Sequence, residues 1–191
     1  MTRARHRPTS HRAQRGVAAV EFAYAAMCFF VFMFAIFEFS RALFLWNTMT
    51  EVTRRAARVA AVSAFDPLSI SASKYHAMFD KTSVPLANDI TAAHLVIDYL
   101  GADTETVVTA MPATAAENLV NCTANPNGAS CVRFVRVRFC LDGGAGCAPM
   151  PYTMMTGLHG FLDGLIMFPR FTTISPIGSL GRMPSVPASS L

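Results

Sequence analysis

The sequence predicts an α+β protein, in which a long N-terminal helix spans a membrane and continues into a small exported domain with an antiparallel sheet. Three observations support this fold class. Residues 17–37 are almost entirely apolar, no helix breaker follows before Pro67, and residues 132–141 contain an alternating strand pattern. A length of 191 residues suits one small domain plus an anchor.

The apolar segment is long enough to cross a bilayer. It reads VAAVEFAYAAMCFFVFMFAIF, and its only polar members are Glu21 and Tyr24. A helix of roughly 20 apolar residues, rising 1.5 Å per residue, spans the ~30 Å hydrocarbon layer. A cleaved secretory signal is the alternative, but it needs a shorter apolar core followed by a small-residue cleavage site. Here the run is followed by the sequence Phe-Glu-Phe-Ser-Arg at 37–41, so we expect the helix to be retained.

The positive charge of the chain is concentrated before this segment. Residues 1–16 contain five of the 16 basic residues and no acid, so residues 17–191 carry 11 basic and 12 acidic side chains, a net charge of −1. A basic arm before an apolar helix predicts a cytoplasmic N-terminus and an exported C-terminal domain. A nucleic-acid-binding arm is the rival interpretation, but membrane insertion already accounts for the charges, and we expect no nucleic-acid partner.

Glu21 is unusual, because a carboxylate near the edge of a bilayer costs on the order of a few kcal/mol unless it is paired. Gly16 precedes it by five residues in the sequence Gly-Val-Ala-Ala-Val-Glu-Phe, which ends at Phe22. This pattern resembles the prepilin-peptidase recognition site of type IV pilins and pseudopilins. The resemblance implies cleavage between Gly16 and Val17 on the cytoplasmic face, with Glu21 able to pair with the new N-terminal amine of a neighbouring subunit.

The segment after the apolar run indicates which family of pilin-like proteins the sequence resembles. Residues 37–44 read FEFSRALF and residues 53–61 read TRRAARVAA. Together with the Glu21–Phe22 pair, they resemble the TadE-like proteins of tight-adherence (Tad) pilus machines, and 168–181 resembles the usual ending of that family. The resemblance implies a pilin-like fold and a minor pseudopilin needed to assemble Flp-type (type IVb) pili in a Gram-negative inner membrane. Its implied partners are a prepilin peptidase, other pilins or pseudopilins, inner-membrane pilus assembly proteins and the lipid bilayer.

Glu38, Arg41 and Trp46 follow the apolar run. Glu38 and Arg41 are spaced i, i+3, so they can pair on one helix face. We expect that pair, with Trp46 as an aromatic anchor, to mark the membrane interface or a helix-packing surface, without a chemical role.

The remaining chain predicts short elements. Met49, Val52, Ala56 and Val59 define one helical face, and the helix is expected to continue to Phe65. A short helix over 69–80, strands over 95–100 and 107–110, a helix or loop over 114–121, and a strand over 132–141 are expected after it. An apolar, glycine-rich segment begins at 157. The predicted organisation is therefore a basic leader (1–16), a transmembrane and extended helix (17–66), an α+β domain (67–183) and a loose tail (184–191).

Five cysteines are present, and Cys28 lies within the apolar helix. The other four, Cys122, Cys131, Cys140 and Cys147, lie on the exported side, where an even count favours two disulfides. Three pairings are possible. Joining sequence neighbours is favoured because each bond would close a local loop that contains a turn signal. Zinc is the alternative, but intervals of eight, eight and six residues do not match the usual Cys-x2–4-Cys pair, so no metal is expected.

No catalytic pattern stands out. His76, His94 and His159 are scattered, no serine lies in a Gly-x-Ser-x-Gly motif, and the glycines of 143–146 lack the Lys-Ser/Thr of a phosphate loop. We therefore expect a structural and interaction protein, not an enzyme, and no cofactor. The alternative function is an uncleaved, membrane-tethered adaptor or binding module of an envelope complex.

Overall fold

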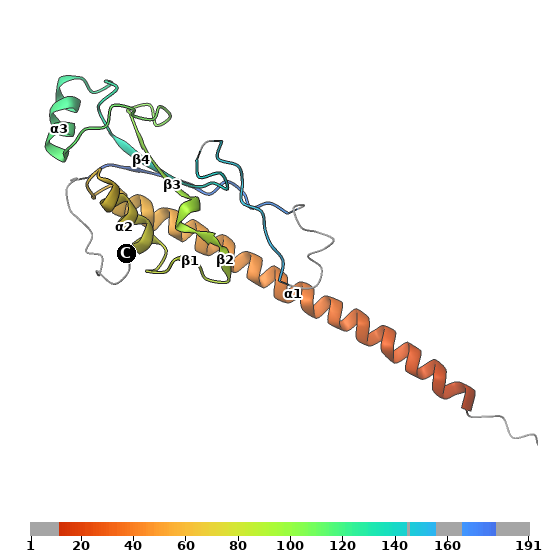
Figure 1. Ribbon diagram of the computed structural model, residues 1–191. Coiled ribbons are helices and arrows are strands. Elements are labelled where there is room, and N and C mark those ends of the chain that lie inside the picture. The colour runs from red at the N-terminus through yellow and green to blue at the C-terminus, as the bar shows by residue number, and fades with distance from the viewer. Residues whose placement is uncertain (1–11, 145, 156–165, 179–191) are drawn as a thin grey trace, which may run out of the picture. The chain divides into compact units, whose positions relative to one another are not determined.

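The computed structural model describes residues 12–144, 146–155 and 166–178, with side chains from Gly16 onward. The chain divides into two compact units, Met1–Ser40 and Arg41–Leu191. The division falls within the first helix, α1 (Arg12–Ala60), which is drawn from red to orange in Figure 1. The α+β fold class predicted from the sequence is confirmed, with a long apolar helix followed by a small domain that contains antiparallel sheets.

In the second unit, α1 supplies one stripe of side chains to the core. Met49, Val52 and Ala56 are fully buried, as their spacing predicted, and Ala57 and Ala60 extend the same surface. The arginines of this part of the helix, Arg54, Arg55 and Arg58, are exposed. The buried face is therefore narrow and rich in alanine.

The helix ends earlier than the sequence predicted, at Ala60 instead of Phe65. The Ser63 hydroxyl donates to the carbonyl of Val59 at 2.7 Å, and the amide of Gly178 donates to the carbonyl of Ala61 at 3.0 Å. These bonds satisfy carbonyls at and just past the end of the helix. At this point α1 therefore contacts a segment that is distant in the sequence.

The second helix, α2 (Pro67–Ala77), begins at a well-formed cap. Asp66 accepts hydrogen bonds from the Ser69 amide at 2.9 Å and the Ser69 hydroxyl at 2.6 Å, and Pro67 occupies the first helical turn. An Asp cap followed by Pro is a favoured helix start. The helix therefore lies two to three residues before the range of 69–80 expected from the sequence.

The domain contains two antiparallel sheets (Figure 1). The first pairs β1 (Ser83–Val84) with β2 (Ala87–Thr91). A short 3₁₀ turn, η1 (Ala92–His94), leads into the second sheet, whose order is β3-β4-β5: β3 (Leu95–Leu100), β4 (Phe134–Phe139) and β5 (Thr172–Pro176). A third helix, α3 (Ala115–Ala124), precedes β4. The sequence analysis identified β3, β4 and the region of α3, but not β1, β2 or β5.

Strand β4 is the centre of the larger sheet and follows the predicted alternation. Val135, Val137 and Phe139 are buried, whereas Arg136 and Arg138 point to the other face. The alternation predicted beyond Phe139 is wrong, because Cys140 is fully buried and Leu141 is 47% exposed. The strand ends at Phe139, and the chain then turns through a disulfide-bonded loop, which reverses the faces of both residues.

The strand expected at 107–110 does not form. Val107 makes a single antiparallel bridge to Leu100, and the Val108 amide donates to the carbonyl of Tyr99 at 2.9 Å. Bends at Thr109 and Ala110 then end the pairing. The region expected to be helix or loop at 114–121 is helical because the Thr114 hydroxyl caps α3 through the Glu117 amide.

Some expectations fall outside the described residues. These are the basic leader before Arg12, most of the apolar segment that begins at 157, and the tail from 184. Of the apolar C-terminal residues that the structure describes, Phe168 is buried and forms edge-on ring contacts with Tyr152 at 5.3 Å.

Candidate functional site

The motif Gly16–Phe22 lies in the first turns of α1 that have described side chains. A Cβ atom added to Gly16 would meet nothing within 4 Å, and the backbone there has no left-handed angle. Glycine within a helix costs about 1 kcal/mol relative to alanine. The described residues therefore show no packing or backbone reason for glycine at this position.

The part of α1 that follows this motif exposes its apolar side chains all around the helix. Val20, Phe22, Phe32 and Ile36 are each about two-thirds exposed or more, and none of the most apolar 18-residue window is buried within the chain. By length and composition the helix can cross a membrane. Exposing so large an apolar surface to water is unfavourable. This part of α1 therefore requires lipid or a partner helix around it.

Arg41, the first residue of the second unit, connects three segments of that unit. Its guanidinium donates to the carbonyl of Leu86 through Nε at 3.2 Å and Nη2 at 2.9 Å. Nη1 donates to the carbonyl of Thr153 at 2.7 Å and to the Tyr152 hydroxyl at 3.2 Å. The guanidinium carbon also lies 5.2 Å from the centroid of the Tyr152 ring.

Arg41 thus has a role that its sequence spacing did not reveal. The contacts described above join α1 to the β1–β2 turn and to the chain near Thr153, and the local pair with Glu38 stays a prediction. Only arginine can donate to two carbonyls in this fork geometry while stacking on an aromatic ring. No local signal predicts partners that lie 45 and 112 residues further along the chain.

Trp46 also contacts the domain. Its ring meets Phe171 edge-on, with centroids 5.7 Å apart, and about half of the side chain stays exposed. A half-exposed tryptophan can pack against protein on one side and still face a membrane interface on the other. Trp46 therefore packs against the domain, and its role at a membrane interface stays a prediction.

These features occupy one continuous stretch of sequence, from the motif at Gly16 to the buried stripe of α1. Residues 16–58 match the family model described as TadE-like protein. Comparisons with curated proteins and with solved structures found no match. The TadE-like segment thus covers the motif, the exposed apolar helix, Arg41 and most of the buried stripe.

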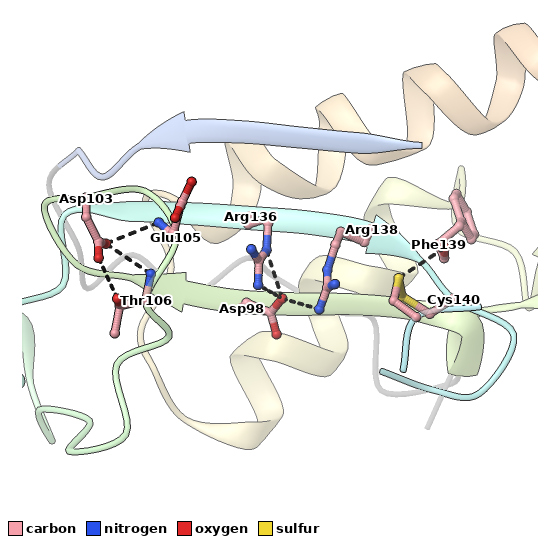
Figure 2. Close-up of polar contacts among 9 residues, drawn as sticks. Asp98, Asp103, Glu105, Thr106, Arg136, Arg138, Phe139 and Cys140 are labelled. Carbon is pink, nitrogen blue, oxygen red and sulfur yellow. Dashed lines mark hydrogen bonds and ion pairs between the residues drawn. A yellow bond between two sulfur atoms is a disulfide. The ribbon is translucent and has the colours of Figure 1, made fainter. Parts of the chain in front are cut away.

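Outside the TadE-like segment, a charged cluster lies on the face of the larger sheet opposite the buried side chains of β4. Figure 2 shows Arg136 and Arg138 on β4 both pointing toward Asp98 on β3. One oxygen of Asp98 accepts from Arg136 at 3.0 and 3.1 Å and from Arg138 at 2.7 Å. The cluster is about four-fifths buried and carries a net charge of +1. It stabilises the pairing of β3 with β4 and leaves an excess of positive charge on that face.

The two disulfides join sequence neighbours, Cys122 with Cys131 and Cys140 with Cys147. This is the pairing that the local turn signals favoured. The first bond holds α3 to the start of β4, where the Asn118 amide group also exchanges two hydrogen bonds with the backbone of Val132, at 2.9 and 3.0 Å. Because Asn118 is the buried residue of α3, polar and covalent links hold this helix in place of a large apolar contact.

Hydrogen bonds and burial account for the pKa shifts of four side chains in the second unit. Hydrogen bonds from Ser69 lower the pKa of Asp66, burial lowers the pKa of Lys74, and burial followed by the charge of Asp66 raises the pKa of Tyr99 to about 12. Hydrogen bonds from Thr106 lower the pKa of Asp103. The same bonds, drawn in Figure 2, hold the loop 103–106 together. Within the described part of the chain, no three His, Cys, Asp or Glu side chains gather as metal ligands would.

Proposed function

We propose that this protein is a minor pseudopilin required for the assembly of Tad/Flp-type pili, anchored by α1 in the bacterial inner membrane. A prepilin peptidase would cleave it between Gly16 and Val17. The single observation that carries the proposal is the presence of the Gly16–Phe22 motif within the segment that matches the TadE-like family. A TadE-like segment is typical of pseudopilins associated with Tad pili.

The geometry around Gly16 supports recognition of this motif. The residue is exposed, uncrowded and free of any backbone requirement for glycine. A glycine with no packing function, placed between a basic leader and an apolar helix, gives a peptidase an unhindered bond to cleave. The five arginines of the leader would hold that bond on the cytoplasmic side.

The mechanism we propose has three steps. Cleavage releases the leader and gives Val17 a free amine, about 6 Å along the helix axis from Glu21. The exposed apolar surface of α1 then associates laterally with other pilins or pseudopilins in the bilayer. Within that assembly, Glu21 pairs with the amine of a neighbour, which offsets the cost of placing a carboxylate near lipid. The exported domain contacts inner-membrane assembly proteins in the periplasm.

A second candidate function retains the leader. In it, the protein is an uncleaved adaptor whose apolar helix only tethers the exported domain to an envelope complex. The positively charged face around Arg136 and Arg138 favours a binding role of this kind. The two candidates differ at the Gly16–Val17 bond, so one measurement separates them.

The decisive experiment is the N-terminal sequence and intact mass of the full protein isolated from its native membrane, in strains with and without an active prepilin peptidase. We expect a chain that begins at Val17 in the first strain and retains the leader in the second. Gly16→Ala should block processing, because the added methyl group meets the peptidase and not the protein itself.

A matched control is Ala13→Gly, a change of the same size three residues upstream, which should be processed normally. Glu21→Gln should also be processed but should reduce pilus assembly, counted by electron microscopy. A chain that keeps its leader in the presence of active peptidase would reject the pseudopilin proposal and favour the tethered adaptor.

A further inference from the structure

The turn between β1 and β2 has a residue that neither the turn nor the core explains. Pro85 and Leu86 connect the two strands, and Leu86 has a φ angle of 64°. Proline followed by a left-handed residue is the pattern of a type II turn, in which glycine or asparagine is strongly preferred at the second position. A leucine there holds a strained backbone conformation.

The Leu86 side chain gains little from the rest of the domain in return. It is 57% exposed, although Val84 and Ala87 on either side of the turn are buried. Leu86 therefore carries two costs, the exposure of an apolar side chain to water and a left-handed backbone conformation. This combination points to a contact outside the chain.

The contacts of Arg41 fix how far along α1, and so how far from the apolar segment, this turn lies. The Arg41 guanidinium donates twice to the Leu86 carbonyl, at 2.9 and 3.2 Å, so Leu86 lies within one side-chain length of the Arg41 backbone. Residues 17–40 directly precede Arg41 in the chain, and 24 helical residues rise roughly 36 Å, against a hydrocarbon thickness of ~30 Å. Arg41 therefore emerges at the level of the lipid headgroups.

Other side chains near Arg41 suit the same level. Leu43 and Phe44 lie within one helical turn of it and are each about half exposed. Exposed apolar side chains on the helix next to Arg41 suit a membrane interface, where apolar groups enter the upper acyl region. All of these residues belong to the unit that begins at Arg41.

We propose that the Pro85–Leu86 turn is a second membrane contact of this protein, and that Leu86 inserts into the interface of the same bilayer that α1 crosses. The occupant is lipid, because the turn is hydrogen-bonded to Arg41, which follows the apolar segment 17–37 by four residues. With Arg41 fixing the turn, the contact orients the exported domain on the membrane surface. This inference rests on membrane anchoring by α1, not on cleavage at Gly16.

Tryptophan quenching by brominated lipid tests the proposal. The full chain, with its single native tryptophan removed as Trp46→Phe, is reconstituted into vesicles of phosphatidylethanolamine and phosphatidylglycerol. A fraction of phosphatidylcholine brominated near the top of the acyl chain is included. Leu86→Trp in this background should lose much of its emission when brominated lipid replaces plain lipid, and its emission maximum should shift to the blue.

Two further tryptophans calibrate the result. Phe30→Trp lies in the middle of the apolar segment and reports insertion of α1, while Leu119→Trp is on the exposed face of α3 and should behave as in water. Quenching of Leu86→Trp close to that of Phe30→Trp supports the proposal. Quenching no greater than that of Leu119→Trp overturns it while leaving the anchor intact, and loss of quenching at Phe30→Trp would overturn the anchor as well.

Discussion

The two parts of α1 on either side of Arg41 use apolar residues in opposite ways. Before Arg41, apolar side chains surround the helix, and Val31 is 52% exposed. After Arg41, polar residues return and the apolar residues form one stripe, in which Val52 is fully buried. The first part needs an apolar solvent on all sides, whereas the second part needs a protein domain on one side.

This difference shows that pattern, not apolar content, decides what a helix contacts. An unpatterned run of 21 residues has no preferred face and is suited to lipid. A stripe with spacing of three and four has one face, and β3, β4 and their neighbours cover it. The predictions below compare matched residues from the two sides of Arg41.

The largest difference is expected for valine-to-aspartate substitutions. Val52→Asp places an unpaired carboxylate in the core, which should lower the free energy of unfolding by more than about 4 kcal/mol and abolish the folded domain. Val31→Asp should leave the domain folded in detergent micelles. Fluorescence of Trp46, which packs on Phe171 and is the single tryptophan of the chain, reports unfolding of the domain by denaturant.

For membrane insertion, Val31→Asp should have the larger effect and Val52→Asp the smaller one. Val31→Asp should reduce the membrane-integrated fraction, because a carboxylate at the centre of a helix costs on the order of 2.5–3.5 kcal/mol during insertion. Val52→Asp should leave that fraction unchanged after alkaline extraction. If Val31→Asp also unfolded the domain in micelles, the two parts of α1 would not be independent and the comparison would fail.

A smaller difference is expected for the cysteines. Replacing Cys140 and Cys147 together by serine should lower the free energy of unfolding by about 2–3 kcal/mol, because the bond closes a short loop at the end of β4. Cys28→Ser should change it very little, because Cys28 lies in the apolar helix and has no disulfide partner in the described chain. Denaturation in micelles, with and without a reductant, measures both effects. Equal losses from the two changes would contradict the assignment.

The local patterns that sequence analysis uses were sufficient for several elements. Alternation predicted the buried face of β4 at Val135 and Val137, and spacing predicted the stripe at Met49 and Val52. Both signals depend on the chain's own periodicity, so no distant residue is needed to interpret them. The Gly16 motif is also local in sequence, and its role stays a prediction.

Features that depend on distant partners were not predictable. Strand β5 contains Thr172, Thr173 and Ser175, and forms only because its backbone pairs with β4. The contacts of Arg41 with Leu86 and Thr153 span 45 and 112 residues, and the Ala61 carbonyl just past the end of α1 accepts from the amide of distant Gly178. In each case the contact joins residues that are far apart in the sequence.

Tyrosines give a third comparison, with an expected effect near 1 kcal/mol. Tyr99 is buried, and its hydroxyl has no hydrogen-bond partner among the described residues, whereas Tyr24 is exposed on the apolar helix. Tyr99→Phe should raise the free energy of unfolding by about 1 kcal/mol at neutral pH, because it removes an unsatisfied buried hydroxyl. Tyr24→Phe should leave it unchanged. A loss of stability in Tyr99→Phe would indicate a bound water or another partner for the hydroxyl.

The pH dependence of Tyr99 has a definite sign. Burial raises its folded-state pKa to about 12, above the ordinary value of 10.0. The unfolded chain therefore loses this proton first, so stability is full below pH 10 and falls by about 2 kcal/mol as the pH rises toward 12. Denaturation of the wild type and of Tyr99→Phe between pH 8 and pH 12 should show this fall only in the wild type.

The smallest effect concerns Leu86, whose carbonyl accepts from Arg41. Leu86→Gly should raise the free energy of unfolding in micelles by a few tenths to about 1 kcal/mol, because glycine adopts the left-handed turn without strain but loses more chain entropy on folding. Leu119→Gly, at another exposed position within α3, should lower it by about 1 kcal/mol. If Leu86→Gly instead destabilised the domain as much as Leu119→Gly, the leucine would be serving the fold. Stabilisation by Leu86→Gly would mean that the domain gives up stability to keep an exposed leucine in this turn, as the proposed lipid contact requires.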